Sequence, residues 1–140
     1  MNPPRIDHIG IVVDDLEASI VSMKRLLPGA PLTRRSIPDA GLEVAEFAAA
    51  NLVVELLQYT DDGDSFGRAT MGSTPGVNHL SLAVDDLDAA LETLRAQGIE
   101  PLTGFPRRGA HGRIAFLPRD AGTGLSFEFC EPDDEAEATR

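Results

Sequence analysis

A repeated phrase constrains the fold of this chain more than any other feature. The stretch "RIDHIGIVVDDLEA" begins at Arg5, and "GVNHLSLAVDDLDA" begins at Gly76. The histidines of the two copies are His8 and His79, so the offset is 79 − 8 = 71, and the same offset relates the Asp-Asp pairs at 14–15 and 85–86. One structural unit has therefore been duplicated within this chain of 140 residues.

Each copy predicts a strand, a helix and three more strands. A run of β-forming residues ends at the Asp-Asp pair, which caps a helix, and apolar residues at helical spacing follow. These helix stripes are Leu16, Ile20, Met23 and Leu27 in the first copy, and Leu87, Leu91 and Leu94 in the second. The later strands are expected at about 31–37, 42–48 and 52–59, and at about 99–105, 113–117 and 124–130.

The duplication predicts an α+β fold in which two βαβββ modules form a pseudo-twofold curved sheet around a cavity. We expect a single domain over residues 1–132, with module one at about 5–59 and module two at about 76–132. The linker at 60–75 is rich in turn-forming residues and lacks a helical pattern. Acidic residues crowd 133–140, which predicts a disordered tail.

Composition excludes several classes of protein. A net charge of −11 argues against a nucleic-acid binder, because phosphate binding needs a basic face. No apolar run is long enough to span a bilayer, and the start of the chain lacks the layout of a signal peptide. The single cysteine, Cys130, rules out an internal disulfide and fits a reducing compartment. We expect a cytoplasmic protein that binds neither nucleic acid nor membrane.

Two acids extend the duplicated pattern to a metal site. Glu55 and Glu128 interrupt the apolar last strands of the two copies, 47 residues after His8 and 49 residues after His79. A charge inside an apolar strand is costly unless it is paired or bound to a metal. Each module then offers one imidazole and one carboxylate, which makes a His₂Glu₂ set for a divalent metal in the shared cavity. An octahedral metal would keep up to two positions open for an oxygen ligand.

A cluster of arginines contrasts with the acidic character of the chain. Its members, Arg107, Arg108, Arg113 and Arg119, fall within thirteen positions. This cluster predicts attraction of an anionic ligand.

The motifs "DHIGI", "VELL", "NHLSL" and "FEFCE" resemble those of the vicinal oxygen chelate superfamily, the glyoxalase, bleomycin resistance and dioxygenase group. The resemblance covers the chain from Arg5 to Pro132. Within that superfamily, "PRRGAHGRIAFL" in the second half is similar to methylmalonyl-CoA epimerases. The resemblance implies an isomerase that moves a proton at the carbon α to a thioester.

The resemblance also implies roles for residues. His8, Glu55, His79 and Glu128 would hold the metal, which we expect to be divalent Co, Mn, Ni, Fe or Zn, with no organic cofactor. An acyl-CoA or related thioester would be the substrate, and its nucleotide phosphates would contact the segment of Arg107, Arg108, Gly109, Ala110, His111, Gly112 and Arg113. Relatives also suggest a homodimer.

The two catalytic carboxylates are expected to be Glu128 and Glu46. Some epimerases carry the second acid at the position of Val44 in this chain, which departs from that pattern. Side chains two apart in a strand share a face, so Glu46 points with Val44, whereas Glu43 points away. We therefore predict that Glu46 takes over the role of the second acid.

Three other functions fit the same scaffold. A glyoxalase I-like enzyme would use the same four ligands and a similar proton transfer. A ring-cleaving dioxygenase uses two histidines and one carboxylate, and the second glutamate would fill one of its open positions. A drug-sequestering protein of the bleomycin-resistance type needs no metal ligands, whereas this chain keeps all four.

Overall fold

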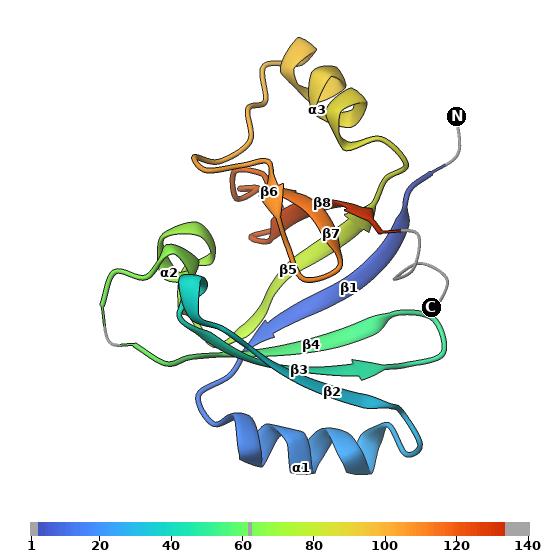
Figure 1. The fold of residues 1–140 in the computed structure, drawn as a ribbon, viewed down its shortest axis with the longest axis vertical. Coiled ribbons are helices and arrows are strands. Elements are labelled where there is room, and N and C mark those ends of the chain that lie inside the picture. Colours follow the sequence, from blue (N-terminus) through green and yellow to red (C-terminus); the bar gives the residue numbers. More distant parts are fainter. Residues whose placement is uncertain (1–2, 62, 134–140) are drawn as a thin grey trace. The chain divides into compact units, whose positions relative to one another are not determined.

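A computed structural model gives the fold of residues 3–61 and 63–133. In the first half the elements are β1 (Arg5–Val12), α1 (Leu16–Leu26), β2 (Leu32–Ile37), the 3₁₀ turn η1 (Pro38–Ala40), β3 (Leu42–Ala48), β4 (Val53–Tyr59) and α2 (Phe66–Met71). In the second half they are β5 (Gly76–Ala83), α3 (Leu87–Ala96), β6 (Arg107–Arg108), β7 (Gly112–Phe116) and β8 (Ser126–Pro132) (Figure 1). The predicted α+β class and the βαβββ order of both halves are confirmed.

The chain divides into two compact units. One unit consists of residues 8–79, and the other contains the described residues before 8 and after 79. The boundaries fall inside β1, between Asp7 and His8, and inside β5, between His79 and Leu80. The predicted enclosure of a cavity by two modules stays a prediction, as does the single domain over 1–132.

The unit of residues 8–79 is built on a sheet in which β2, β3, β4 and β1 are neighbours in that order. Strand β3 is antiparallel to β2 and to β4, whereas β4 is parallel to β1. Helix α1 follows β1 in the chain, so the connection from β1 to the hairpins runs through a helix, as parallel strands require.

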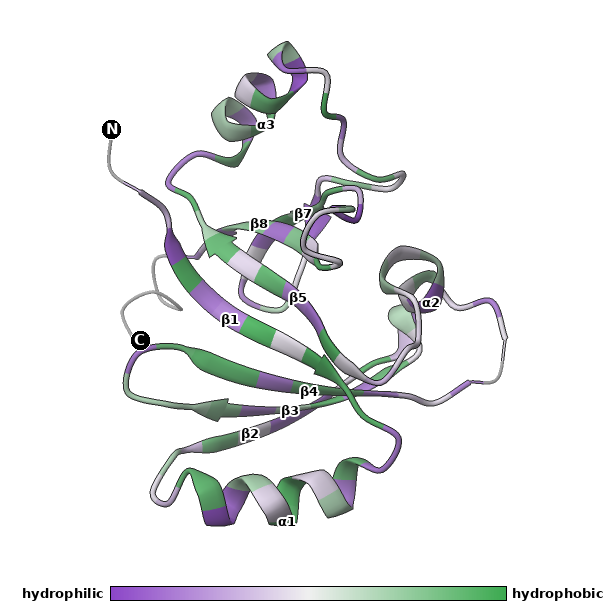
Figure 2. Cartoon of the chain, turned by 180° about the vertical axis from the view of Figure 1, so that it is seen from behind, coloured by the Kyte–Doolittle hydropathy of each residue, from purple (hydrophilic) through white to green (hydrophobic). Residues whose placement is uncertain are grey.

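Helix α1 begins where the sequence predicts it. The carboxylate of Asp15 accepts a hydrogen bond from the backbone N–H of Ala18 at 3.0 Å, which satisfies one of the free donors of the first turn. Hydrophobic and hydrophilic residues alternate along the helix (Figure 2). Its buried residues Leu16 and Ile20 pack on Phe47 of β3 and Leu56 of β4, so α1 covers one face of this sheet.

The opposite face of the same sheet carries the polar residues of interest. Register pairs Val44 with Leu57 and Glu46 with Glu55, so these four side chains share one face. Alternation separates them from Phe47 and the other residues packed under α1. Glu46 is 6 % exposed, although it is charged.

The other unit repeats the helix start at the predicted offset. Asp86 of this unit accepts a hydrogen bond from the backbone N–H of Ala89 at 3.0 Å, as Asp15 does from Ala18. Leu87 and Leu91 of α3 pack on Ala115 in a core cluster. Strand β7 is antiparallel to both β6 and β8. Both predicted helix stripes are therefore confirmed.

Two local predictions are wrong. The strand expected at 99–105 is absent, and the strand after α3 is β6, which has only two residues. Pro101 cannot donate to a ladder, and Gly104 has a φ of 92°, which turns the chain. The linker contains a helix, α2, whose first turn is capped by Ser65 and whose end is followed by Gly72 at a φ of 73°.

Two further predictions concern the acidic tail and membrane-spanning helices. The acidic tail expected over 133–140 lies outside the described residues except for Asp133, whose carboxylate accepts a hydrogen bond from Arg108 at 2.7 Å. No helix within 3–61 or 63–133 is long and apolar enough to cross a membrane.

Candidate metal centre

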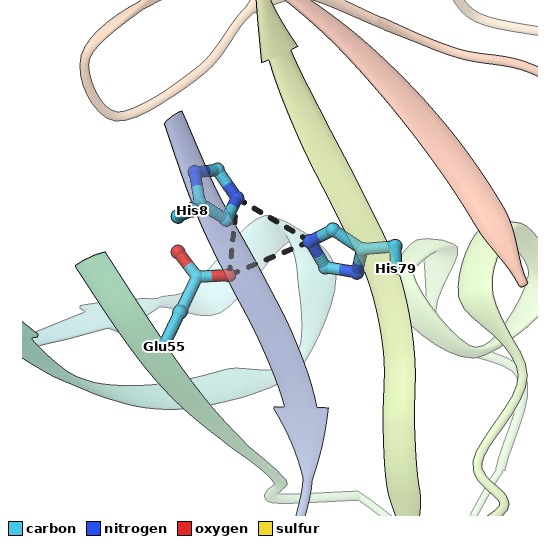
Figure 3. A group of neighbouring side chains, drawn as sticks. All are labelled: His8, Glu55 and His79. Atoms are coloured by element: carbon cyan, nitrogen blue, oxygen red, sulfur yellow. Dashed lines mark hydrogen bonds and ion pairs between the residues drawn. The ribbon is translucent and has the colours of Figure 1, made fainter. Parts of the chain in front are cut away.

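Three of the four predicted ligands converge in the unit of residues 8–79. His8 comes from β1, Glu55 from β4 and His79 from β5, and their side chains point toward one another (Figure 3). One carboxylate oxygen of Glu55 lies 3.7 Å from Nε2 of His8 and 3.7 Å from Nε2 of His79. The two Nε2 atoms are 3.4 Å apart.

The register between β1 and β4 explains how the first two ligands meet. In this parallel pair His8 is opposite Val53 and Gly10 is opposite Glu55. Because alternate residues share a face, His8 and Glu55 lie on the same side of the sheet, away from α1.

Gly10 makes room for the third ligand. A Cβ atom at this position would lie 2.1 Å from Cε1 of His79 and 2.5 Å from its Nε2. No side chain fits at such distances, so the glycine inside β1 lets the imidazole of His79 lie against the backbone. Sequence reasoning missed this role, although a glycine within a strand is a signal of close approach.

The electrostatics of His79 suit a ligand. The residue is 1 % exposed. Burial, reinforced by the charge of His8, lowers the pKa of His79 from 6.5 to about 3. The imidazole is therefore neutral at physiological pH, which is the form that binds metals.

These residues fit a divalent transition metal. The three ligand atoms lie within 4.8 Å of one another, and two imidazole nitrogens with one carboxylate oxygen suit ions of intermediate hardness. Ligand atoms that share one ion at about 2.1 Å lie within about 4.2 Å of each other. The separations of 3.7, 3.7 and 3.4 Å between these atoms satisfy that limit.

Glu128 belongs to the other unit, and its role as fourth ligand and base stays a prediction. It is 4 % exposed, and one of its carboxylate oxygens accepts a hydrogen bond from the hydroxyl of Ser81 at 2.5 Å. The hydroxyl partially compensates the burial of the charge. The sequence pattern gave no reason to single out Ser81.

Glu46 is buried on the face that carries Glu55, and it forms an ion pair with Arg35 of β2. Glu46 therefore does not lie at a solvated strand end. Glu43 is opposite Gln58 in the register and accepts a hydrogen bond from Ser36. The predicted difference in direction between Glu43 and Glu46 is confirmed, whereas Arg35 was missed.

The predicted substrate-binding segment, 107–113, forms the hairpin of β6 and β7. The backbone N–H of Gly109 donates to the carbonyl of Gly112 at 2.7 Å, which closes a tight turn with Ala110 and His111 at its tip. A Cβ at Gly112 would lie 2.1 Å from the carbonyl oxygen of Glu131, so glycine is required there.

The arginines of this hairpin do not act as one group. Arg108 and Arg113 are opposite each other in the register, while Arg107 is opposite Ile114. Arg108 pairs with Asp133, and Arg113 pairs with Asp88 at 3.2 Å. The guanidinium of Arg119, elsewhere in the unit, donates to the carbonyl of Gly124 at 2.6 Å.

Comparison with known families defines the class of protein. Residues 7–116 match the family model of the glyoxalase/bleomycin resistance protein/dioxygenase superfamily, and the chain belongs to this superfamily. The resemblance on which the sequence analysis relied is thereby confirmed.

Individual relatives indicate an activity within this superfamily. The ethylmalonyl-CoA/methylmalonyl-CoA epimerase of Cereibacter sphaeroides is 32% identical over 120 residues, which cover 83% of this chain and 90% of that protein. The crystal structure of methylmalonyl-CoA epimerase from Mycobacterium tuberculosis has a TM-score of 0.79 at 29% identity and covers 96% of this chain and 91% of that one. A methylmalonyl-CoA epimerase in complex with methylmalonyl-CoA and NH4+ has a TM-score of 0.75 at 29% identity, with 95% and 97% covered. The expectation of an epimerase-like enzyme is confirmed.

Proposed function

We propose that this chain is a divalent-metal-dependent epimerase that inverts the carbon α to a thioester, with methylmalonyl-CoA as substrate. The observation that carries the proposal is the convergence of His8, Glu55 and His79 on a fold shared with methylmalonyl-CoA epimerases. The relative that holds methylmalonyl-CoA supports the choice of substrate.

The metal would be held by His8, Glu55 and His79, with Glu128 as the fourth ligand. When bound, a divalent metal supplies a fixed positive charge that stabilises the negative charge developing on the thioester oxygen as the α-proton leaves. The chain contributes neutral imidazole at His79 and a buried setting in which water competes weakly.

Two carboxylates would move the proton. Glu128 is proposed to act on one side of the α-carbon, with its carboxylate oriented by the hydrogen bond from the hydroxyl of Ser81. Glu46 is proposed to act on the opposite side, which is supported by its burial on the face of Glu55. One carboxylate removes the proton while the other group delivers one, and the centre is inverted.

The hairpin of β6 and β7 would bind the CoA nucleotide. Arg108 and Arg113 are exposed to solvent and their ion pairs with Asp133 and Asp88 are surface pairs, which contribute little to stability. A phosphate can therefore replace either carboxylate at small cost. Arg107 and the turn at 109–112 complete the proposed contact surface.

The protein is further proposed to be a homodimer and to act in the cytoplasm. Val77 on β5 is 56 % exposed and Ile6 on β1 is 40 % exposed, and apolar side chains of this size on strands suit an interface between copies. Light scattering coupled to size-exclusion chromatography measures the expected mass of two chains.

The test of function is incubation of the metal-loaded protein with methylmalonyl-CoA in D₂O. Mass spectrometry measures deuterium at the α-carbon, and a coupled mutase reports which stereoisomer is present. We expect both stereoisomers to interconvert with incorporation of one deuterium, and treatment with a chelator to abolish the reaction until Co²⁺ is restored. A metal-loaded protein that incorporates no deuterium refutes the proposal.

A second substrate separates the nearest alternative. A glyoxalase I-like enzyme acts on the hemithioacetal of methylglyoxal and glutathione. Turnover of that hemithioacetal without exchange of methylmalonyl-CoA would assign the same metal site to the glyoxalase reaction instead.

A further inference from the structure

Asn78, the neighbour of His79, makes two hydrogen bonds inside the unit of residues 8–79. The residue is buried, with only 4 % of its surface exposed. The amide nitrogen donates to the backbone carbonyl of Met71 at 2.8 Å, and the amide oxygen lies 2.9 Å from Nδ1 of His79. An amide with both ends engaged has one orientation only.

The partner at Met71 determines which end of the amide faces the histidine. A carbonyl oxygen only accepts hydrogen bonds, so the amide end next to Met71 must be the NH₂ group. The oxygen of Asn78 therefore faces His79, and because this oxygen only accepts, Nδ1 must carry the proton. Nε2 is then left with a lone pair, and Nε2 is the atom that lies 3.7 Å from Glu55.

Helix α2 provides the carbonyl of Met71 that accepts the hydrogen bond of Asn78. Met71 is the last residue of α2, where backbone carbonyls have no partner within the helix. The hydroxyl of Tyr59, at the end of β4, lies 2.6 Å from the carbonyl of Gly72 and 3.0 Å from that of Gly67. Burial raises the pKa of Tyr59 to about 12, so this hydroxyl stays a donor.

A charged pair fixes the same helix from its other side. The guanidinium of Arg68 lies 4.4 Å from the centre of the Tyr59 ring, and it pairs with Asp61 at 3.2 Å. Tyr59 of β4, the strand that carries Glu55, thus bonds to the carbonyl of Gly67 in α2 and to that of Gly72 just after it. Asn78 bonds to Met71 of the same helix, so α2 connects β4 with Asn78.

We propose that Asn78 is a positioning residue, held by α2 through the carbonyl of Met71, that fixes His79 in the tautomer with the proton on Nδ1. This inference rests on the proposed metal function only for its consequence, which is a preorganised Nε2 ligand. Loss of such an outer hydrogen bond reduces metal affinity by about 10- to 100-fold in other metalloproteins.

The first test measures the tautomer of the metal-free protein. Nitrogen-15 NMR of histidine-labelled protein distinguishes a protonated ring nitrogen from one with a lone pair, and comparison with His79→Gln identifies the signals of His79. We expect protonated Nδ1 in the unsubstituted protein and a shift toward protonated Nε2 in Asn78→Leu. Protonated Nε2 in the unsubstituted protein overturns the inference, whether or not the protein binds metal.

The second test measures affinity for Co²⁺ by titration, without any substrate. Asn78→Leu should bind about 10- to 100-fold more weakly. Asn51→Leu, the same change in the exposed turn between β3 and β4, should bind as the unsubstituted protein does. Equal affinities and tautomers in the two variants would overturn the inference. Failure of the unsubstituted protein to bind Co²⁺ would refute the metal proposal alone, because the tautomer is measured without metal.

A third variant covers the case in which Asn78→Leu does not fold. Asn78→Asp keeps an oxygen toward Nδ1 of His79 and replaces the donor to Met71 by a second carboxylate oxygen. We expect it to keep the proton on Nδ1, and loss of that tautomer in the folded Asp variant contradicts the inference.

Discussion

Glu46 of β3 and Glu55 of β4 are directly opposite each other, and both carboxylates lie on the face of the sheet away from α1. Two like charges in this position destabilise a sheet unless each has a partner. Glu46 is paired with Arg35, while Glu55 is 3.7 Å from an imidazole nitrogen of His8 and from one of His79. The face thereby carries one ion pair and one cluster of side chains that could hold a metal ion.

Replacement of His79 by Ala should abolish metal binding, because it removes one of two imidazole ligands from a three-residue cluster. Elemental analysis of the purified variant, together with Co²⁺ titration, measures this loss. His111→Ala is the control: 111 − 71 gives position 40, an alanine, so His111 has no counterpart in the duplicated pattern. A His79→Ala protein that retains one metal per chain with unchanged affinity would show that the site is misassigned.

Gly10→Ala should displace His79 and weaken metal binding as strongly as loss of a ligand. The added methyl group would lie 2.1 Å from Cε1 of the imidazole, which forces the ring to move. Overpacking of this kind also lowers the free energy of unfolding by about 1–3 kcal/mol. Gly63→Ala provides the matched control, since a Cβ there meets nothing within 4 Å. Normal Co²⁺ affinity in Gly10→Ala contradicts the close approach described above.

The stability of the metal-free protein should fall as the pH decreases from about 6.5 to about 3. His79 has a pKa of about 3 in the folded protein and 6.5 as its ordinary value, so in this range the unfolded chain binds a proton that the folded one does not. His79 then contributes a slope of up to about 1.4 kcal/mol per pH unit, which fades as the pH rises through 6.5. Urea unfolding at several pH values measures it, and His79→Gln should remove this part of the slope. An unchanged slope in that variant argues against a buried neutral imidazole.

Ser81→Ala should destabilise the protein, because it leaves the buried carboxylate of Glu128 without the 2.5 Å hydrogen bond from the hydroxyl. Hydrogen bonds to charged groups contribute about 1.5–3 kcal/mol to the free energy of unfolding. Ser36→Ala removes a similar Ser–Glu hydrogen bond at an exposed site, where surface substitutions change stability by about 0.5 kcal/mol or less. Urea unfolding of both variants provides the comparison, and equal losses would mean that burial does not strengthen the Ser81–Glu128 bond.

The three residues of the candidate metal centre could be predicted because the duplication and the apolar pattern of the strands are visible in the sequence. The offset of 71 identifies His8 and His79, and the apolar neighbours of Glu55 mark it as unusual. Alternation along the predicted strand likewise places Glu46 and Glu43 on opposite faces, as the register of β3 with β4 confirms.

The partners of these residues depend on information that a pattern does not contain. Arg35 reaches Glu46 only because β2 pairs with β3 in one register. Asn78 donates to the backbone carbonyl of Met71, the last residue of α2, and a helix of six residues has too few positions to show a period in the sequence. A signal for Asn78 did exist, since 78 − 71 gives Asp7, which is also buried and also precedes a histidine.

Glu46→Gln tests the two-carboxylate mechanism, because it keeps the shape of the side chain and removes the proton acceptor. We expect metal content to stay unchanged, since Glu46 is not in the ligand cluster, and epimerisation to fall by about 10²- to 10⁴-fold. Exchange of the α-proton with D₂O should survive from one stereoisomer only, because the remaining carboxylate still serves its own side of the carbon.

Two controls separate chemistry from the ion pair that Glu46 forms with Arg35. Glu43→Gln should be nearly silent, because Glu43 lies on the other face of β3 and is bonded to Ser36. Arg35→Met removes the partner but keeps the carboxylate, so it should retain exchange from both stereoisomers, whereas Glu46→Gln should not. If Arg35→Met and Glu46→Gln give the same one-sided exchange, Glu46 acts by holding Arg35 in place and the arginine is the group that the reaction requires. Full activity in Glu46→Gln would instead assign the second proton transfer to a different residue.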